Sequence, residues 1–204
     1  MEKTNKKLKK ILVIIAHPDD ETIWMGGTLL KNKSSWRITI ISLCRRDDKE
    51  REPRFEKACK EFNAKCFISD LDDSETEEYK KISSEDVINK LKQFIEDKNK
   101  NYDYIFSHGE NGEYGHIRHI EVHNAVNEML DKKLLSAKKV FFFSYIKKDS
   151  ISIVDENSDK FIKLNKLLLN KKKHMIKEIY GFNENSFENK CCNEVESFKI
   201  KKIT

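Results

Sequence analysis

The sequence predicts an α/β fold, a Rossmann-like open sheet that is mostly parallel and carries helices on both faces. Short apolar runs rich in β-branched residues alternate with amphipathic helical patterns between residues 9 and 145. Continuous apolar runs are typical of strands covered on both faces, and strands that alternate with helices favour a parallel sheet. Polar residues directly follow two of the runs, where open α/β sheets bind their ligands.

Five apolar runs are expected to form strands, at residues 11–16, 37–44, 65–69, 102–108 and 139–146. The first of them, "ILVIIA", ends directly at the motif "HPDDE". In the helix that follows this motif, Gly26 and Gly27 are expected to permit close packing.

Helical spacing of apolar residues predicts helices over residues 83–98 and 121–130. Ser83 and Asp86, three positions apart, resemble a capping box at the start of the first of these helices. Residues 161–182 also have a helical pattern, whereas the last 20 residues carry no clear signal. We therefore expect a single domain over residues 1–204, with a core at about 9–145 and a region at about 150–204 of unassigned role.

Composition argues against several classes of protein. The net charge of +5 comes from scattered lysines, and runs such as "NKKLKK" are interpreted as solvated helix surfaces. No basic patch is interleaved with aromatic residues, so nucleic acid is not an expected partner. The six-residue apolar run before "HPDDE" is too short for a signal peptide, and no run reaches the roughly 20 residues of a membrane span. Five cysteines without C-x-x-C spacing favour a cytoplasmic protein without disulfides.

Two segments contain the residues that could perform chemistry. Three consecutive acids in "AHPDDE" (residues 16–21) repel one another, which indicates that a cation lies beside them. Four of the six histidines lie within a second segment, at positions 108, 116, 119 and 123. If this segment opens a helix, His116, His119 and His123 share one face.

Imidazole and carboxylate ligands without thiolates favour Zn²⁺, with Fe²⁺ or Co²⁺ as alternatives. A catalytic zinc ion has three protein ligands and an open position. One carboxylate of the acidic motif could therefore bind the metal while its neighbour accepts a proton from water. The zincin motif H-E-x-x-H is absent, because the glutamate of "HIEVH" stands one position late.

The motif "AHPDDE" after the first strand and the downstream "GEYGHIRH" resemble the PIG-L/LmbE-like zinc-dependent N-acetylglucosaminyl deacetylase family. The resemblance implies removal of an N-acetyl group from an N-acetylglucosamine-containing small molecule or glycoconjugate. It also implies the metal ligands His17, Asp20 and His119, and Asp19 as the general base. His116 would then assist at the oxyanion or protonate the leaving amine.

The substrate contacts that we expect come from several loops. The family often has an arginine after the second strand, which makes Arg51 and Arg54 candidates. Asp70, with Asp72 and Asp73, ends the third strand and could bind sugar hydroxyls, although an ordinary acidic turn is the simpler interpretation. The remaining candidates, near the histidines, are Glu113, Tyr114 and Arg118.

One departure from the family and one alternative function remain. Many members have proline and an acid between the two histidines, whereas this chain has Ile117 and Arg118. The alternative is a non-catalytic Rossmann-like module that binds a nucleotide or sugar and holds a structural metal ion. The sequence leaves open the native metal, the full substrate and a homo-oligomeric state.

Overall fold

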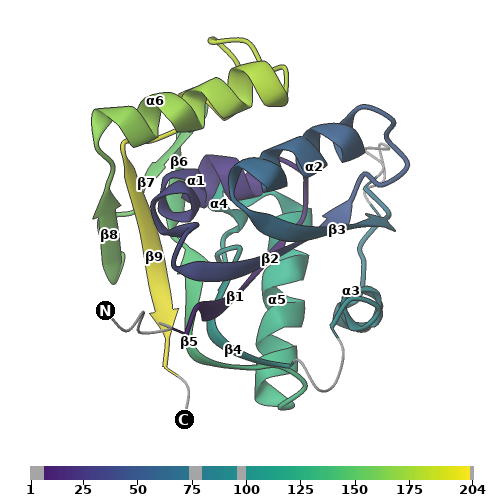
Figure 1. Cartoon of the computed structure of the whole chain (residues 1–204). Helices are drawn as coiled ribbons and strands as arrows, with labels where there is room; N and C mark the ends of the chain where they lie inside the picture. The colour runs from purple at the N-terminus through teal and green to yellow at the C-terminus, as the bar shows by residue number, and fades with distance from the viewer. Residues whose placement is uncertain (1–6, 74–79, 96–99, 203–204) are drawn as a thin grey trace.

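Seven strands form one sheet in the computed structural model of this chain, which describes residues 7–73, 80–95 and 100–202 (Figure 1). Their order is β3-β2-β1-β4-β5-β9-β8. The five predicted strands all form, and they are parallel to one another. Their bounds are β1 (Lys9–Ile15), β2 (Trp36–Cys44), β3 (Ala64–Leu71), β4 (Asn101–Ser107) and β5 (Ser136–Phe143).

Helices cover both faces of the sheet, as predicted. Side chains alternate along β1, so that Ile11 and Val13 face one hydrophobic core while Leu12 and Ile14 face the other. The first core contains residues of α1 (Asp20–Asn32), α2 (Arg51–Glu61) and the π-helix η2 (Met175–Ile179) that continues α6 (Lys166–His174). The second core contains residues of α3 (Ser84–Lys92) and α5 (Ile117–Asp131). Burial on both faces explains the uninterrupted apolar run of β1.

Ser83 is confirmed as the N-cap of α3. The Ser83 hydroxyl accepts a hydrogen bond from the Asp86 N–H at 3.2 Å and donates one to the Asp86 carboxylate at 2.7 Å. The helix α3 ends at Lys92, earlier than predicted, and the last part of the predicted segment (96–98) lies outside the described residues.

The C-terminal region completes the sheet. The helix predicted over residues 161–182 is wrong at its start, because β8 (Lys160–Lys163) pairs with β9 (Val195–Lys201) and α6 begins only after the N-cap Asn165. β9 in turn pairs antiparallel with β5. Between these elements lie the hairpin β6 (Tyr145–Lys148) and β7 (Ile151–Val154) and the short helix α7 (Phe187–Lys190).

The strand order creates a switch point between β1 and β4. The chain proceeds from β1 outward to β3 and then returns to place β4 on the other side of β1. The loops that leave the carboxyl ends of β1 and β4 therefore lie next to each other, where open α/β sheets bind ligands. Within the described part of the chain, no helix is long and apolar enough to cross a membrane.

Candidate metal centre

The loop after β1 folds back on itself and turns its acids inward. Asp19 has φ of 116°, a left-handed conformation that costs a residue other than glycine about 1–3 kcal/mol. Its carbonyl accepts the Ile23 N–H at 2.8 Å, and the His17 N–H donates to Oδ2 of Asp20 at 2.8 Å. These bonds place His17 and the buried carboxylates of Asp19 and Asp20 at one spot.

Three donor atoms from the two predicted segments converge. His17 Nδ1 lies 3.4 Å from Asp20 Oδ2 and 3.2 Å from His119 Nε2, and His119 Nε2 lies 3.5 Å from Asp20 Oδ2. Tetrahedral ligands at 2.0–2.1 Å from a zinc ion would be about 3.3–3.4 Å apart. The indole of Trp24 donates to the other oxygen of Asp20 at 3.0 Å, which fixes the orientation of that carboxylate. These residues therefore fit one divalent ion.

Glu113 lies behind His119 and is fully buried. Its Oε2 is 2.5 Å from His119 Nδ1 and 2.9 Å from His108 Nδ1. A carboxylate at Nδ1 keeps the proton on that nitrogen and leaves Nε2 of His119 free for a metal. Burial lowers the pKa of His119, which also favours the neutral ring.

His108 directly follows β4 and was not assigned a role from the sequence. Its Nε2 accepts the N–H of Ala16 at 2.9 Å, while its Nδ1 faces Glu113. This pair of bonds ties the end of β1 to the loop after β4. His108 also forms a potential ligand cluster with Asp20 and His119.

Asp73 lies beside His17 on the side away from His119. Its Oδ1 is 3.1 Å from His17 Nε2, and its Oδ2 is 2.6 Å from Nη2 of Arg45. Burial alone would raise the pKa of Asp73, but the hydrogen bond to His17 and the charges of His17 and Arg45 hold it at about 2. Asp73 is therefore ionised in the folded protein.

Asp19 is buried and lines a cavity next to these groups. Burial raises its pKa to about 8, with a further contribution from the charge of Asp20, whereas the guanidinium of Arg51 opposes the rise. Nη1 of Arg51 donates to Asp19 Oδ2 at 2.8 Å. A carboxylate with a raised pKa beside a cavity is typical of a general base.

His116 is the N-cap of α5 and stacks on His119, with ring centroids 4.5 Å apart. Burial and the neighbouring rings of His119 and His17 lower its pKa to about 3. Its Nδ1 is buried and has no hydrogen-bond partner among the described residues.

A cavity of about 150 Å³ adjoins this cluster. One wall is aromatic, because Tyr114 packs against Phe187 with centroids 4.7 Å apart and lies 6.3 Å from Trp24. Its polar lining consists of His17, Asp19, Asp20, Arg45, Arg51, Asp73, His116 and Glu188. An aromatic wall opposite convergent polar groups suits a small polar molecule with an apolar face.

The structure brings only some of the predicted substrate residues to this cavity. Arg51 and Tyr114 line it. Arg54 instead donates to the Tyr180 carbonyl at 2.5 Å and to Glu50, and the exposed Asp70 pairs with Lys90. The buried Glu113 and Arg118 are not part of the lining; Arg118 donates to the Glu121 carboxylate.

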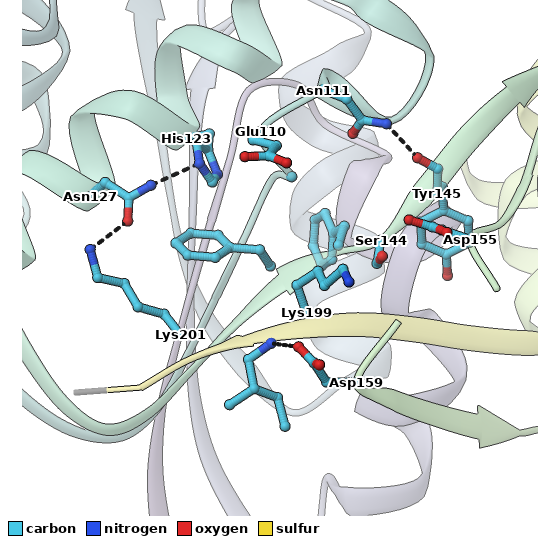
Figure 2. A pocket seen from close by; sticks show the side chains of 14 residues that line it. Glu110, Asn111, His123, Asn127, Ser144, Tyr145, Asp155, Asp159, Lys199 and Lys201 are labelled. Carbon is cyan, nitrogen blue, oxygen red and sulfur yellow. Dashed lines mark hydrogen bonds between the residues drawn. The ribbon is translucent and has the colours of Figure 1, made fainter. Parts of the chain in front are cut away.

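His123 does not join the cluster, although it lies one helical turn after His119. Its Nδ1 donates to the carbonyl of His108 at 2.8 Å, and its Nε2 accepts from Asn127 at 2.8 Å. Figure 2 shows this ring at the edge of a second, larger cavity of about 470 Å³, where Asn127 bridges His123 and Lys201. None of the predicted site residues borders that cavity.

The sequence named Asp73 only as one of three acids that could bind sugar hydroxyls, and it did not point to five other residues of the cavity lining: Ile23, Trp24, Arg45, Phe187 and Glu188. Arg45 directly follows β2, so its position at a strand end was a usable signal. Phe187 and Glu188 lie in α7, in a region where no pattern distinguished them.

Comparisons with known proteins concern the family and the fold of this chain. The profile of the PIG-L family, described as GlcNAc-PI de-N-acetylase, matches residues 12–130. The comparison with curated proteins gives no match.

Solved structures share the fold at low sequence identity. The N,N'-diacetylchitobiose deacetylase from Pyrococcus horikoshii, in complex with its inhibitor MPG, has a TM-score of 0.69 at 16% identity, over 98% of this chain and 87% of that chain. The conserved protein TT1542 from Thermus thermophilus has a TM-score of 0.68 at 14% identity, over 97% of this chain and 96% of that chain. GalB, the 4-carboxy-2-hydroxymuconate hydratase from Pseudomonas putida KT2440, has a TM-score of 0.67 at 14% identity, over 97% of each chain.

Proposed function

Since the chain belongs to the PIG-L family, the GlcNAc-PI de-N-acetylases, we propose that it is a zinc-dependent hydrolase that removes the N-acetyl group from an N-acetylated amino sugar or its conjugate. The observation that carries the proposal is the convergence of His17 Nδ1, Asp20 Oδ2 and His119 Nε2 within 3.5 Å of one another, beside the free face of Asp19.

These three residues would hold the metal. Bound zinc acidifies water and polarises a carbonyl, which are two requirements of amide hydrolysis. Imidazole and carboxylate donors suit Zn²⁺, and Fe²⁺ or Co²⁺ would fit the same donor set. A metal held by these three residues would have room for water and substrate on the side of the cavity, which is lined by Asp19 and His116.

Asp19 is the proposed general base. It would accept a proton from the attacking water and return it to the departing nitrogen, since it lines the cavity beside the proposed metal ligands and burial raises its pKa. Arg51 anchors one of its oxygens and thereby sets the direction of the other.

His116 is assigned the role of hydrogen-bond donor to the acetyl oxygen. Its low pKa keeps the ring neutral, so that one nitrogen carries a proton for donation. The His116 side chain lines the cavity in which a substrate would lie. A donor at this position would stabilise the charge that develops on the oxygen.

The amino-sugar substrate class rests on the family and on the cavity. The aromatic wall of Trp24, Tyr114 and Phe187 suits the apolar face of a sugar ring. Arg51 and Tyr114 are the substrate contacts that we retain from the sequence. The metal-holding binding module is less favoured, because it assigns no role to the raised pKa of Asp19 or to the unsatisfied His116.

The test combines metal content with turnover. Zinc is measured by mass spectrometry in untagged protein and in His119→Ala, and acetate release is measured with a panel of N-acetylglucosamine conjugates. We expect about one zinc per chain, lost in His119→Ala, and Asp19→Asn should keep zinc but lose roughly 10²–10⁴-fold in turnover. The control Asp70→Asn removes an exposed carboxylate away from the cavity and should change neither quantity. Zinc without acetate release from any conjugate would favour the binding module.

A further inference from the structure

The position after β3 carries a buried acid that touches a proposed metal ligand. Asp73 is only 9% exposed, and its Oδ1 lies 3.1 Å from Nε2 of His17. The other nitrogen of His17 faces Asp20 and His119. The two nitrogens of one ring therefore point to different partners, with Asp73 opposite the proposed metal position.

An acceptor at Nε2 decides the tautomer of His17. A carboxylate there holds the proton on Nε2 and leaves the lone pair of Nδ1 available to a metal. Glu113 makes the equivalent contact with His119 from the other side of the site. Each histidine of the proposed metal site therefore has a buried carboxylate next to the ring nitrogen that does not face the metal position.

One arginine binds Asp73 in this position and a second lies near it. Nη2 of Arg45 binds its Oδ2 at 2.6 Å, and Nε of Arg118 lies 4.0 Å from its Oδ1. Arg118 is 1% exposed and also donates to Glu121, whose other oxygen accepts the N–H of Ile82 at 2.8 Å. The side chain that distinguishes this chain from the common Pro-Asp pattern is therefore buried beneath the site and does not face the cavity.

The charge of this cluster explains why a cation at position 118 suits this chain. Asp73 and Glu121 are both buried acids, so a third acid between them would add repulsion, whereas Arg118 offsets their charge. This relationship links the arginine between the two histidines to the acid after β3.

We propose that Asp73 is a positioning residue that orients His17 for the metal through Nε2, and that Arg45 holds it in place. The inference rests on the proposed function, since it takes His17 as a metal ligand. The rival role is a direct contact with substrate hydroxyls, because Asp73 and Arg45 also line the cavity.

The rate of zinc dissociation separates the two roles. This rate is a property of the zinc-bound protein, so it does not depend on the protonation of His17 in the metal-free protein. Zinc-loaded protein is mixed with an excess of a chromophoric chelator, and metal release is followed for Asp73→Asn and for the control Asp70→Asn at the end of the same strand. We expect release from Asp73→Asn to be roughly 10- to 100-fold faster than from the wild type, and release from Asp70→Asn to be unchanged.

Further variants keep the test decisive. If Asp73→Asn does not fold, Arg45→Met leaves the acid in place and should still accelerate release several-fold, with recovery in Arg45→Lys. Unchanged release together with a higher KM would overturn the positioning role in favour of substrate contact. Full zinc retention in His17→Ala would instead show that the proposed metal site itself is wrong.

Discussion

Nδ1 of His119 lies 2.5 Å from the carboxylate of the fully buried Glu113, and the same Glu113 oxygen lies 2.9 Å from His108. Burial alone would raise the pKa of Glu113, but the charges and hydrogen bonds of the two histidines hold it at about 2. Glu113 therefore stays ionised at any pH near neutrality. It orients His119 and also contacts His108, whose Nε2 lies 3.4 Å from Oδ2 of Asp20.

Replacing Glu113 by Gln should weaken zinc binding by roughly 10- to 100-fold, because the amide keeps the size of the side chain but loses the charge that anchors His119. Zinc affinity is measured by competition with a chelator of known affinity. The control is Glu110→Gln, which removes an exposed carboxylate from the same loop and should leave the affinity unchanged. Equal affinities in both variants would show that His119 needs no support from Glu113.

Zinc binding should depend on pH through His17. Burial alone would lower its pKa, but hydrogen bonds and charge interactions with Asp20 and Asp73 raise it to about 9 in the metal-free protein. Below this pH the ring carries a proton that must leave before Nδ1 can bind a metal. The apparent affinity should therefore fall about tenfold per unit as the pH decreases from 9 to 7, and titrations in buffers across this range measure the slope. An affinity that is constant over the range would contradict the prediction.

The sequence predicted the central sheet because its strands are buried on both faces. The run "ILVIIA" has no polar interruption, since alternate side chains of β1 enter two different cores. The C-terminal strands lacked this signal. β8 has the sequence KFIK and two exposed lysines, and its partner β9 follows more than 30 residues later, so only tertiary pairing defines it as a strand.

The candidate site also has a part that local sequence patterns predict and a part that only tertiary packing defines. The two motifs were expected to meet because each follows the carboxyl end of a strand, and the family resemblance implied His17, Asp20 and His119 as the ligands within them. The support from Asp73 and Glu113 depends on how the loops after β3 and β4 pack against these ligands. No local pattern distinguishes a supporting acid from an acidic turn.

The buried pair of Lys172 and Glu196 should contribute strongly to stability. Lys172 Nζ lies 2.8 Å from Glu196 Oε1, and both side chains are fully buried between α6 and β9. Glu196 also accepts the N–H groups of Gly27 and Thr28 at 2.8 Å each, so it joins three elements. Lys172→Met should cost about 3–5 kcal/mol of unfolding free energy, because it leaves the carboxylate buried without its cation.

The neighbouring lysine supplies the control for this measurement. Lys171 forms a 2.8 Å ion pair with Glu61 in which both side chains are about two-fifths exposed, so Lys171→Met should cost less than about 1 kcal/mol. Urea unfolding of both variants compares the two pairs. A cost for Lys172→Met as small as that for Lys171→Met would mean that the packing of the methionine replaces the ion pair.

The two adjacent glycines of α1 should respond oppositely to alanine. A Cβ at Gly27 would lie 2.5 Å from Cδ1 of the buried Leu164 and closer still to its Cδ2, so Gly27→Ala must displace that side chain and should cost about 1–3 kcal/mol. A Cβ at Gly26 would have ordinary contacts, the nearest at 3.4 Å from Thr22, and Gly26→Ala should stabilise the helix by about 0.5–1 kcal/mol. The midpoints of thermal unfolding should therefore move in opposite directions. A gain in stability for Gly27→Ala would show that Leu164 adjusts without cost and that close packing of α1 against the segment before α6 does not require glycine.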